Sequence, residues 1–262
     1  MKNTMWSVVL LVILGGIAAA YYYWQMQVTP LPAPASQTEA PPAPAKAEPA
    51  IRHPVQAVPS TGEPLPPLGE SDAAMQGTLA ELFTRKSAVE FFYLKEIVRR
   101  FVVTVDNLPR KKVPMQYRLF KPVSGKFLVT GEGEYFLASP DNYRRYTPYV
   151  FLTNAVDTRK LVAVYVRFYP LFQQEYQNLG YPKGYFNDRL VEAIDDLLAA
   201  PDVPGQIKLV RPNVLYQFAD PNLEDLSAGQ KIMIRLGSEN AARIKARLRD
   251  IRRELTGQDL KS

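Results

Sequence analysis

The sequence predicts a mainly α-helical single domain with one small β-hairpin, preceded by a transmembrane helix and a disordered Pro/Ala-rich linker. Three observations lead to this prediction. An uncharged apolar run occupies residues 6–24, Pro and Ala dominate residues 25–68, and apolar residues recur at helical spacing over 69–262. The chain is 47% apolar, so it can bury a large core, and it contains no Cys. A disulfide framework, a thiolate zinc site and a Cys nucleophile are therefore excluded.

The first element is the apolar run WSVVLLVILGGIAAAYYYW over residues 6–24, which begins and ends with the only two tryptophans of the chain. As a helix it would span roughly 28 Å, close to the thickness of a bilayer's hydrocarbon core. Trp and Tyr favour the headgroup level at both ends of such a span. We therefore expect an anchor in the lipid bilayer over 6–24, with residues 1–5 as a cytoplasmic tip. A cleavable signal peptide, with Ala18 and Ala20 before the cut, is the alternative.

The orientation of the anchor follows from its flanking cations. Lys2 precedes the run, and the next cation after it is Lys46. Lys46 lies beyond the roughly 15–20 residues within which cations steer insertion. The N-terminus should therefore stay in the cytoplasm. The prediction is a single-pass protein of the inner (cytoplasmic) membrane with its C-terminal domain in the periplasm.

The linker over residues 25–68 carries 12 of the 23 prolines of the chain. Such a composition has too few large apolar groups to offset its ordering entropy, and Pro favours an extended polyproline II conformation. At about 3.1 Å per residue, the linker should act as a semi-rigid spacer with a reach of up to ~120 Å. Docking of a Pro-Pro pair on an aromatic groove remains an alternative. The only histidine, His53, lies in this linker and should be solvated.

The globular domain over residues 69–262 carries the whole net charge of +6. Helices are expected from Ser71, over 89–105, from Asp157, over 187–199, from Ser227 and from Ser238. The dipeptides Ser139-Pro140, Thr147-Pro148 and Asp220-Pro221 should each begin a helix. A hairpin is expected from 126–130 and 134–137 around Gly131-Glu132-Gly133, and a short strand or turn near 207–210 and 214–218.

One stripe of apolar residues predicts the longest internal helix. Its members are Leu161, Tyr165, Phe168, Phe172, Tyr176 and Leu179. Their spacings of three and four residues place them on one face of a helix. Pro170 falls inside this segment and should kink or split the helix. Gly180 suits a left-handed cap at its end.

The helix over 187–199 carries acidic residues along one side, among them Asp188, Glu192, Asp195 and Asp196. Two carboxylates in different environments can serve as general acid and base in glycoside hydrolysis, which makes Asp188 and Glu192 candidate catalytic residues. Carboxylates could also hold Ca²⁺ or Mg²⁺. A solvated helix face is the simplest interpretation, and we predict neither a metal site nor a cofactor.

The loop before that helix, GYPKGYFNDR over residues 180–189, is the most distinctive short string. Glycines, tyrosines and an amide beside a helix N-terminus could form a groove for a ligand or peptide. Its candidate binding residues are Tyr185, Asn187, Asp188 and Arg189. The alternative is a sharp interhelical loop with buried tyrosines.

Basic residues are concentrated between Arg85 and Lys126, where cations exceed anions by eight. The candidate binding residues of this region are Arg99, Arg100, Arg110, Lys111 and Lys112. Basic surfaces attract phosphates and carboxylates. In a periplasmic location the anionic partner would be a protein, a lipid headgroup or peptidoglycan, so we expect no nucleic acid. A solvated surface without a dedicated partner is the alternative.

Three strings resemble a known bacterial family, domain of unknown function 3014. They are RRFVVTVDNLPRKKVP (99–114), YPKGYFNDRLVEAIDDLL (181–198) and LVRPNVLYQFADPNLEDLSAGQKIMIRLGSENAARIKARL (209–248). The resemblance covers about residues 68–256. It implies a domain boundary near Leu68 and the layout of a membrane anchor followed by a spacer.

The function predicted from these features is a membrane-anchored envelope protein that serves as a non-catalytic binding or adaptor module in the periplasm. The alternative from another class is a cell-wall glycan hydrolase that uses the carboxylates of the helix over 187–199. The folded domain contains neither Cys nor His. Because these residues supply most nucleophiles and proton shuttles, an enzyme is the less favoured alternative.

Overall fold

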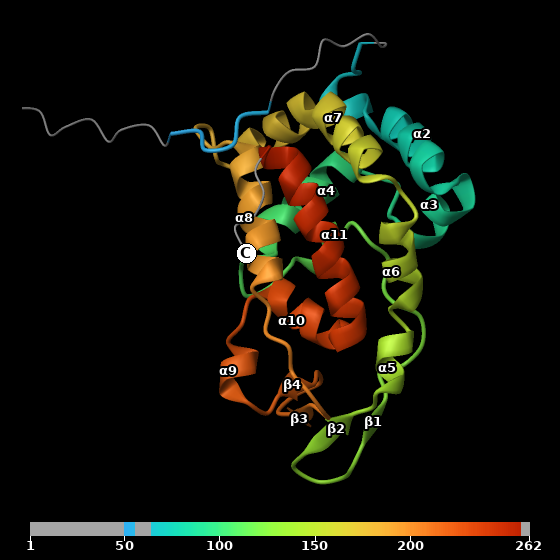
Figure 1. Cartoon of the computed structure of the whole chain (residues 1–262), viewed down its shortest axis with the longest axis vertical. Coiled ribbons are helices and arrows are strands. Elements are labelled where there is room, and N and C mark those ends of the chain that lie inside the picture. The colour runs from blue at the N-terminus through green and yellow to red at the C-terminus, as the bar shows by residue number, and fades with distance from the viewer. Residues whose placement is uncertain (1–49, 56–63, 258–262) are drawn as a thin grey trace, which may run out of the picture. The chain divides into compact units, whose positions relative to one another are not determined.

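The helices of the domain enclose one main core, and a small sheet lies at one end of the domain, beside α10 (Figure 1). The computed structural model describes residues 50–55 and 64–257. Its helices are α2 (Asp72–Phe83), α3 (Arg85–Phe91), α4 (Ile97–Asn107), α5 (Asp141–Arg144), α6 (Thr147–Asn154), α7 (Thr158–Asn178), α8 (Phe186–Leu198), α9 (Pro221–Glu224), α10 (Ala228–Leu236) and α11 (Ser238–Thr256). Within these residues, the prediction of a mainly helical domain is confirmed.

The predicted membrane anchor over 6–24, the tip over 1–5 and most of the linker lie outside the described residues. Among the helices that the structure does describe, none is both long enough and apolar enough to cross a bilayer.

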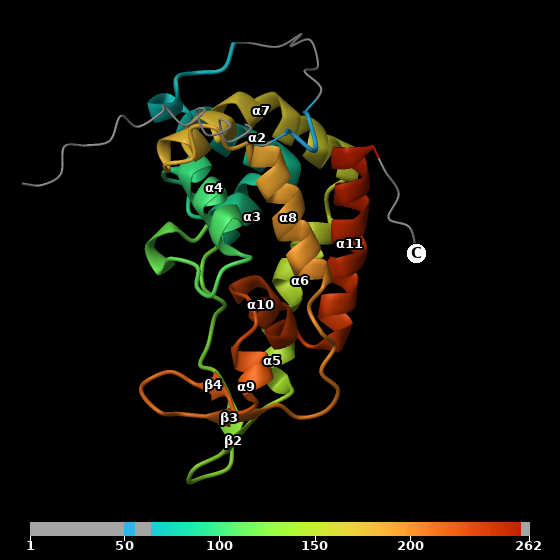
Figure 2. The same cartoon turned by 90° about the vertical axis from the view of Figure 1, so that its left-hand side faces the viewer.

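The main core forms where α4 and α11 pack against α7 and α8 (Figure 2). Phe101 of α4 is central to it, since its ring contacts those of Tyr165, Phe172 and Phe186 at centroid distances of 4.8–6.4 Å. Val102 and Phe186 are fully buried. The stripe that predicted α7 therefore does face the core.

The sequence predicts that Pro170 kinks or splits α7, and the split is wrong, because one helix runs through Pro170 from Thr158 to Asn178. Proline disturbs a helix by removing one hydrogen bond and by crowding the preceding turn. The buried side chains Phe168, Leu171 and Phe172 lie directly beside Pro170. Their packing in the core favours a single helix, because burial of this much apolar surface exceeds the cost of one proline.

The predicted helix over 89–105 is also wrong, because the chain breaks between α3 and α4. Glu96 adopts a left-handed conformation with φ = 53°, directly before the first residue of α4. The carboxylate of Asp72, at the start of α2, accepts hydrogen bonds from the N–H groups of Glu96 and Ile97 at 2.7 and 2.9 Å. A carboxylate at this position satisfies the free N–H groups and favours the helix dipole. Asp72, a residue of α2, thus caps the start of α4.

The β element is larger than the single hairpin that the sequence predicted. Strands β1 (Val129–Thr130), β2 (Phe136–Ala138), β3 (Lys208–Val210) and β4 (Gln217–Phe218) form an antiparallel sheet in the order β1-β2-β3-β4. In the two central strands, Phe136 of β2 pairs with Leu209 of β3. Strands of two or three residues are too short to show an alternation of apolar and polar residues. The sequence therefore indicated β3 and β4 only weakly.

The sheet is attached to the helices through Asn142 at the start of α5, which is 1% exposed. Its side chain accepts a hydrogen bond from the N–H of Leu128 and donates one to the carbonyl of the same residue. A second, smaller core forms between the sheet and α10, where Leu209, Phe218 and Ile234 are buried.

Three predicted helix starts have the expected chemistry, and one of them is Asp220, which accepts the N–H of Asn222 at the start of α9. Ser227 and Gln230 form a capping box at the start of α10, and Asp157 accepts the N–H of Lys160 at the start of α7. The last helix differs from the prediction, because Gly237 rather than Ser238 caps α11. Gly237 has φ = 79°, and a Cβ at this position would lie 2.6 Å from the ring of Tyr143. Only glycine fits this junction between α10 and α11.

The first testable prediction concerns the start of α4. Replacing Asp72 with Ala should lower the free energy of unfolding by about 1–2 kcal/mol, because two N–H groups at the helix start lose their acceptor. Urea unfolding followed by circular dichroism measures this change. The matched control is Asp141→Ala, since Asp141 begins α5 but pairs only with the exposed Arg144. Equal losses for the two variants would contradict the role assigned to Asp72.

Candidate binding site at the start of helix α8

The predicted binding residues of the loop over 180–189 come together where α8 begins. The loop is held tightly: the ring of Tyr181 stacks on that of Tyr176 at 4.6 Å, and a Cβ on Gly184 would lie 2.7 Å from Tyr176. The side chain of Gln173 donates to the carbonyl of Gly184 and accepts the N–H of Phe186. Phe186 is fully buried. The first turn of α8 is thus fixed on both sides.

Residues 50–55 of the chain itself occupy this site. The two carboxylate oxygens of Asp188 accept the N–H groups of Arg52 and His53 at 3.0 and 2.7 Å. The hydroxyl of Tyr185 accepts the N–H of Val55 at 2.7 Å. Asn187 donates its side-chain N–H to the carbonyl of His53 at 2.8 Å. We call this set of four hydrogen bonds the clasp.

The clasp depends on an asparagine whose orientation is fixed from inside the core. Asn187 is fully buried, and its Oδ1 accepts the hydroxyl of Tyr165 at 2.9 Å. Burial raises the pKa of Tyr165 far above its usual range, so the phenol stays protonated and donates. Because Oδ1 is occupied in this way, Nδ2 points toward the carbonyl of His53.

The surroundings of His53 differ from the prediction. The linker prediction placed His53 in solvent, but it is half-buried and bound through both its N–H and its carbonyl. Every hydrogen bond of the clasp on the linker side uses the backbone, and Val55 packs against the main core. The amino-acid composition of residues 50–55 does not reveal these contacts, because almost every residue type carries the same backbone N–H and carbonyl groups.

Arg189 binds in a different direction, toward α4. Its Nε lies 3.1 Å from Oδ1 of Asp106, and the side chains of both residues are largely buried, at 12% and 7% exposed. Arg110 reaches the same Oδ1 at 3.1 Å, and Tyr181 contacts both Arg110 and Asp106. We call these four residues the Asp106 cluster. It joins α4, α8 and the loop before α8.

The carboxylates of α8 all have partners within the domain. Glu192 pairs with Arg189 at 2.8 Å, and Asp195 receives both Nε and Nη2 of Arg252 at 2.6 and 3.1 Å. Asp196 accepts the hydroxyl of Ser227 at 2.6 Å. Burial raises the pKa of Asp196, and the hydrogen bond from Ser227 opposes that shift.

The acidic side of α8 therefore contributes to packing between helices. The two candidate catalytic residues have separate structural contacts: Asp188 belongs to the clasp, and Glu192 forms an ion pair with Arg189. In the described part of the chain, no group of three or more Asp, Glu, His or Cys residues is placed to hold a metal ion.

The comparison with known families now bears on this geometry. The sequence profile described as "Protein of unknown function (DUF3014)" matches residues 97–252, which is more than half of the chain. The chain belongs to the DUF3014 family. The match begins with the first residue of α4 and ends within α11, so it includes Asp106, Asp188 and Arg189. No curated protein and no solved structure matches the chain.

The predicted basic residues of this DUF3014 chain are spread over α4 and the segment that follows it. Arg100 donates to the carbonyls of Lys95, Gln116 and Arg118 and so holds that segment in place. Arg110 belongs to the Asp106 cluster.

The other three basic residues are more accessible. Lys111 pairs with Asp225, and Arg99 lies 3.8 Å from the buried Glu175 while remaining 44% exposed. Lys112 is exposed. Ion pairs within the domain thus partly neutralise Arg99, Arg110 and Lys111, while Lys112 stays exposed.

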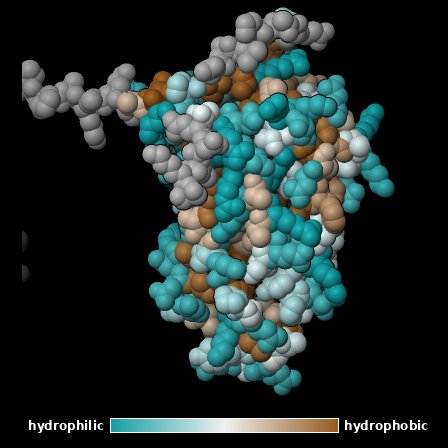
Figure 3. Space-filling view, viewed as in Figure 1, coloured by the Kyte–Doolittle hydropathy of each residue, from teal (hydrophilic) through white to brown (hydrophobic). Residues whose placement is uncertain are grey.

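The surface of the DUF3014 domain seen in Figure 3 is largely hydrophilic, and hydrophobic side chains reach it in scattered patches. Within residues 50–55 and 64–257, the most exposed large apolar side chains are those of Val214 and Leu215 in the loop between β3 and β4, at 78% and 74%. Together they expose apolar surface that a partner could cover. Sequence reasoning missed them because it treated this segment only as an uncertain strand.

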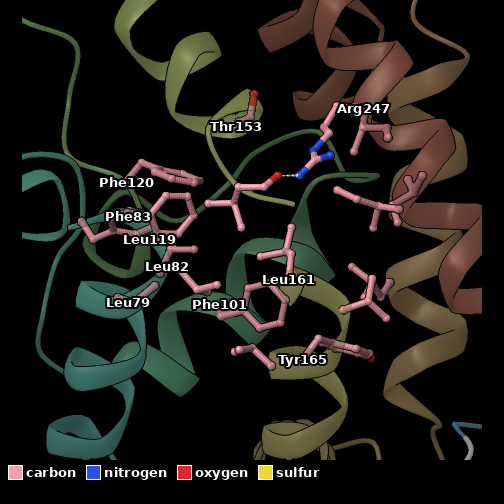
Figure 4. Close-up of a pocket in the computed structure, with 18 of the residues that line it drawn as sticks. Leu79, Leu82, Phe83, Phe101, Leu119, Phe120, Thr153, Leu161, Tyr165 and Arg247 are labelled. Atoms are coloured by element: carbon pink, nitrogen blue, oxygen red, sulfur yellow. Dashed lines mark hydrogen bonds between the residues drawn. The ribbon is translucent and has the colours of Figure 1, made fainter. Parts of the chain in front are cut away.

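Sequence reasoning also missed an apolar cavity of about 300 Å³ inside the domain (Figure 4). Its wall is made by aliphatic and aromatic side chains from α2, α4, α7, α8 and α11. The space is partly open to solvent, and its wall is almost wholly apolar. Concave, mostly apolar spaces of about this volume are the usual form of ligand sites. The cavity is therefore a second candidate binding site.

The Asp106 cluster gives a second testable prediction. Asp106→Asn should lower the free energy of unfolding by about 3 kcal/mol, because the buried Arg189 loses an anionic partner. Urea unfolding should show a lower midpoint with an unchanged slope. The matched control is Asp225→Asn, which removes a carboxylate of the exposed pair with Lys111 and should change the midpoint little. Similar shifts in both variants would argue against a special role for Asp106.

The clasp gives a third prediction, measured by hydrogen exchange of a peptide that contains residues 50–55. Asp188→Ala should make the amides of Arg52 and His53 exchange roughly tenfold faster, because they lose a charged acceptor. Glu192→Gln is the matched control, since it lies one turn further along α8 and contacts Arg189 instead of the linker. Unchanged exchange in Asp188→Ala would show that the clasp does not form in solution.

Proposed function

We propose that this DUF3014 protein is a non-catalytic binding or adaptor module, tethered to the inner membrane by residues 6–24 and facing the periplasm. The membrane part of the proposal rests on the sequence alone, through the uncharged run, its two tryptophans and the position of Lys2.

One observation favours binding over catalysis: the site at the start of α8 holds a peptide backbone. Asp188 uses both carboxylate oxygens for consecutive N–H groups of its own linker. A general acid or nucleophile needs a carboxylate that is free to meet a substrate. The clasp instead attaches the tether to the domain at one defined place.

The partner should be anionic and located in the cell envelope. The domain carries the whole net charge of +6. Arg99 on α4 and Lys111 and Lys112 in the segment after it remain exposed, although Arg99 and Lys111 each lie near a carboxylate. An acidic protein, an anionic lipid headgroup or the carboxylates of peptidoglycan would each complement this charge. Such binding should weaken with rising ionic strength.

The alternative, a cell-wall glycan hydrolase, would need Asp188 and Glu192 as acid and base. No observation favours it, since Asp188 belongs to the clasp and Glu192 pairs with Arg189. The peptidoglycan measurement described below would detect such a hydrolase.

The fourth prediction is made for the full chain in living cells. A photo-crosslinking residue at Lys112 or at Leu215 should capture an envelope partner, and at Lys112 the capture should fall as the salt concentration of the medium rises. The matched control position is Glu81, which is exposed on α2, away from both segments. Equal capture from all three positions would contradict a specific surface.

Two further measurements complete the test of this function. Purified peptidoglycan incubated with the full chain should release no glycan fragments, and Asp188→Asn should change nothing. Release that Asp188→Asn abolishes would establish the hydrolase instead. A reporter fused after Ser262, active only outside the cytoplasm, should be active. A cytoplasmic result would overturn the predicted orientation.

A further inference from the structure

We propose that the site at the start of α8 is a receptor for a short peptide segment of a partner protein, and that residues 52–55 are a ligand of the same form carried by the chain itself. The segment has N–H groups at its first two residues, proline at the third and an aliphatic residue at the fourth. The proposal rests on the binding function proposed above, but it concerns the clasp and not the basic residues or the loop at Leu215.

The first argument is that the domain itself holds the binding side chains in place. The hydroxyl of Tyr165 fixes the amide of Asn187, and the ring of Tyr185 contacts that of Tyr169 at a centroid distance of 5.6 Å. Tyr169 donates its hydroxyl to Gln173, which also holds the backbone on both sides of Tyr185. A site that is fixed before its ligand arrives loses little entropy on binding.

The second argument is that the site requires a peptide backbone. Asn187 is fully buried, and its side-chain N–H donates to the carbonyl of His53. Without an occupant, this buried donor would lose its acceptor, which is costly. The clasp uses three N–H groups and one carbonyl of residues 52–55. Because another chain can supply the same backbone groups, the site can accept a segment from another protein.

The form of the ligand follows from the residues that occupy the site. Pro54 lies between His53 and Val55, at the position whose N–H the clasp does not use. Proline has no N–H, and it limits the conformations of the unbound segment. The side chain of Val55 packs against the main core. A proline followed by an aliphatic residue therefore suits this site.

The third argument is that the chain's own segment makes few side-chain contacts. Val55 packs against the core, whereas Arg52 and Pro54 are exposed and Ile51 is 55% exposed. A ligand on the same chain acts at an effective concentration on the order of millimolar, so it stays bound with few contacts. A partner segment that adds side-chain contacts can replace it. A second copy of this chain offers only the same contacts, so exchange between copies adds none.

The family match agrees with this division into receptor and ligand. Tyr165, Tyr185, Asn187 and Asp188 all lie within residues 97–252, which match the family, and residues 52–55 lie outside the match. The receptor is thus part of the DUF3014 domain, while the segment that fills it comes from the flanking linker.

The test uses the purified full chain in detergent and a synthetic peptide with the sequence of residues 50–56, in which a photoreactive leucine replaces Val55. A released chain carries His53→Pro and Val55→Asp, so that its own segment loses one N–H donor and its apolar contact. On illumination the released chain should take up roughly tenfold more label than the natural chain, within residues 165–189. Arg52→Ala is the matched control, because it changes an exposed side chain and keeps the N–H, and it should be labelled like the natural chain.

Competitor peptides then test the form of the ligand on the released chain. An unlabelled peptide of the natural sequence should prevent labelling. Peptides that carry His53→Pro or Val55→Asp should compete about tenfold less well, because each loses one of the contacts of the clasp. A peptide with Arg52→Ala should compete as well as the natural sequence. These comparisons use one chain, so no substitution in the domain needs to fold.

A substitution in the domain locates the label. Asp188→Asn in the released chain should reduce the label about tenfold, because two N–H groups of the peptide lose their charged acceptor. Glu192→Gln is the matched control and should keep the full label, since Glu192 pairs with Arg189. Circular dichroism of each purified chain checks that its helices are retained.

Four results would overturn the proposal. They are equal labelling of the released and natural chains, label that Asp188→Asn leaves unchanged in a folded chain, and equal competition by all the peptides. The fourth is a dimer of the natural chain that His53→Pro and Val55→Asp dissociate, which would make a second copy the source of the segment. Cross-linking at Lys112 and Leu215 does not involve the clasp, so failure of the function proposed above can be distinguished from failure of this receptor.

Discussion

The ion pair between Arg189 and Asp106 sets the rotation of α8, and the candidate site depends on that rotation. Successive residues of an α-helix point about 100° apart. Asn187, Asp188 and Arg189 therefore cannot share a direction. With Arg189 directed to Asp106 at 3.1 Å, Asn187 enters the core beside Tyr165 and Asp188 faces residues 52 and 53. A small rotation of α8 would displace all three contacts at once.

The sequence predicted those features that depend on neighbours along the chain. The stripe of α7, the capping box of Ser227 and Gln230, and the hairpin before α5 each follow from residues within one element. The same reasoning also singled out Tyr185, Asn187 and Asp188 at the start of α8, which hold residues 52–55 of the chain. It did so because a glycine- and tyrosine-rich loop before a helix with an early Asn and Asp is a pattern visible within ten residues.

The features that the sequence did not predict depend on contacts between distant residues. Asp72 caps the start of α4 although it lies 24 residues before Glu96 in the sequence. Asp188 binds the backbone of His53, from which it is separated by 135 residues. In both cases a carboxylate binds backbone N–H groups, which carry no signature of residue type. The cavity was hidden for a related reason. A count of Leu and Phe predicts that a core exists, but the space left between side chains depends on how six helices meet.

The clasp has a mechanical consequence. In an anchored chain, tension between membrane and domain would enter the domain at Arg52 and His53. It would act first on two hydrogen bonds to a single carboxylate, which lie at the surface end of α8. Those bonds would break before any helix unfolds, because the core holds α8 through Phe186 and Arg189. The tether would then lengthen while the domain stays folded, so its length would depend on the applied force.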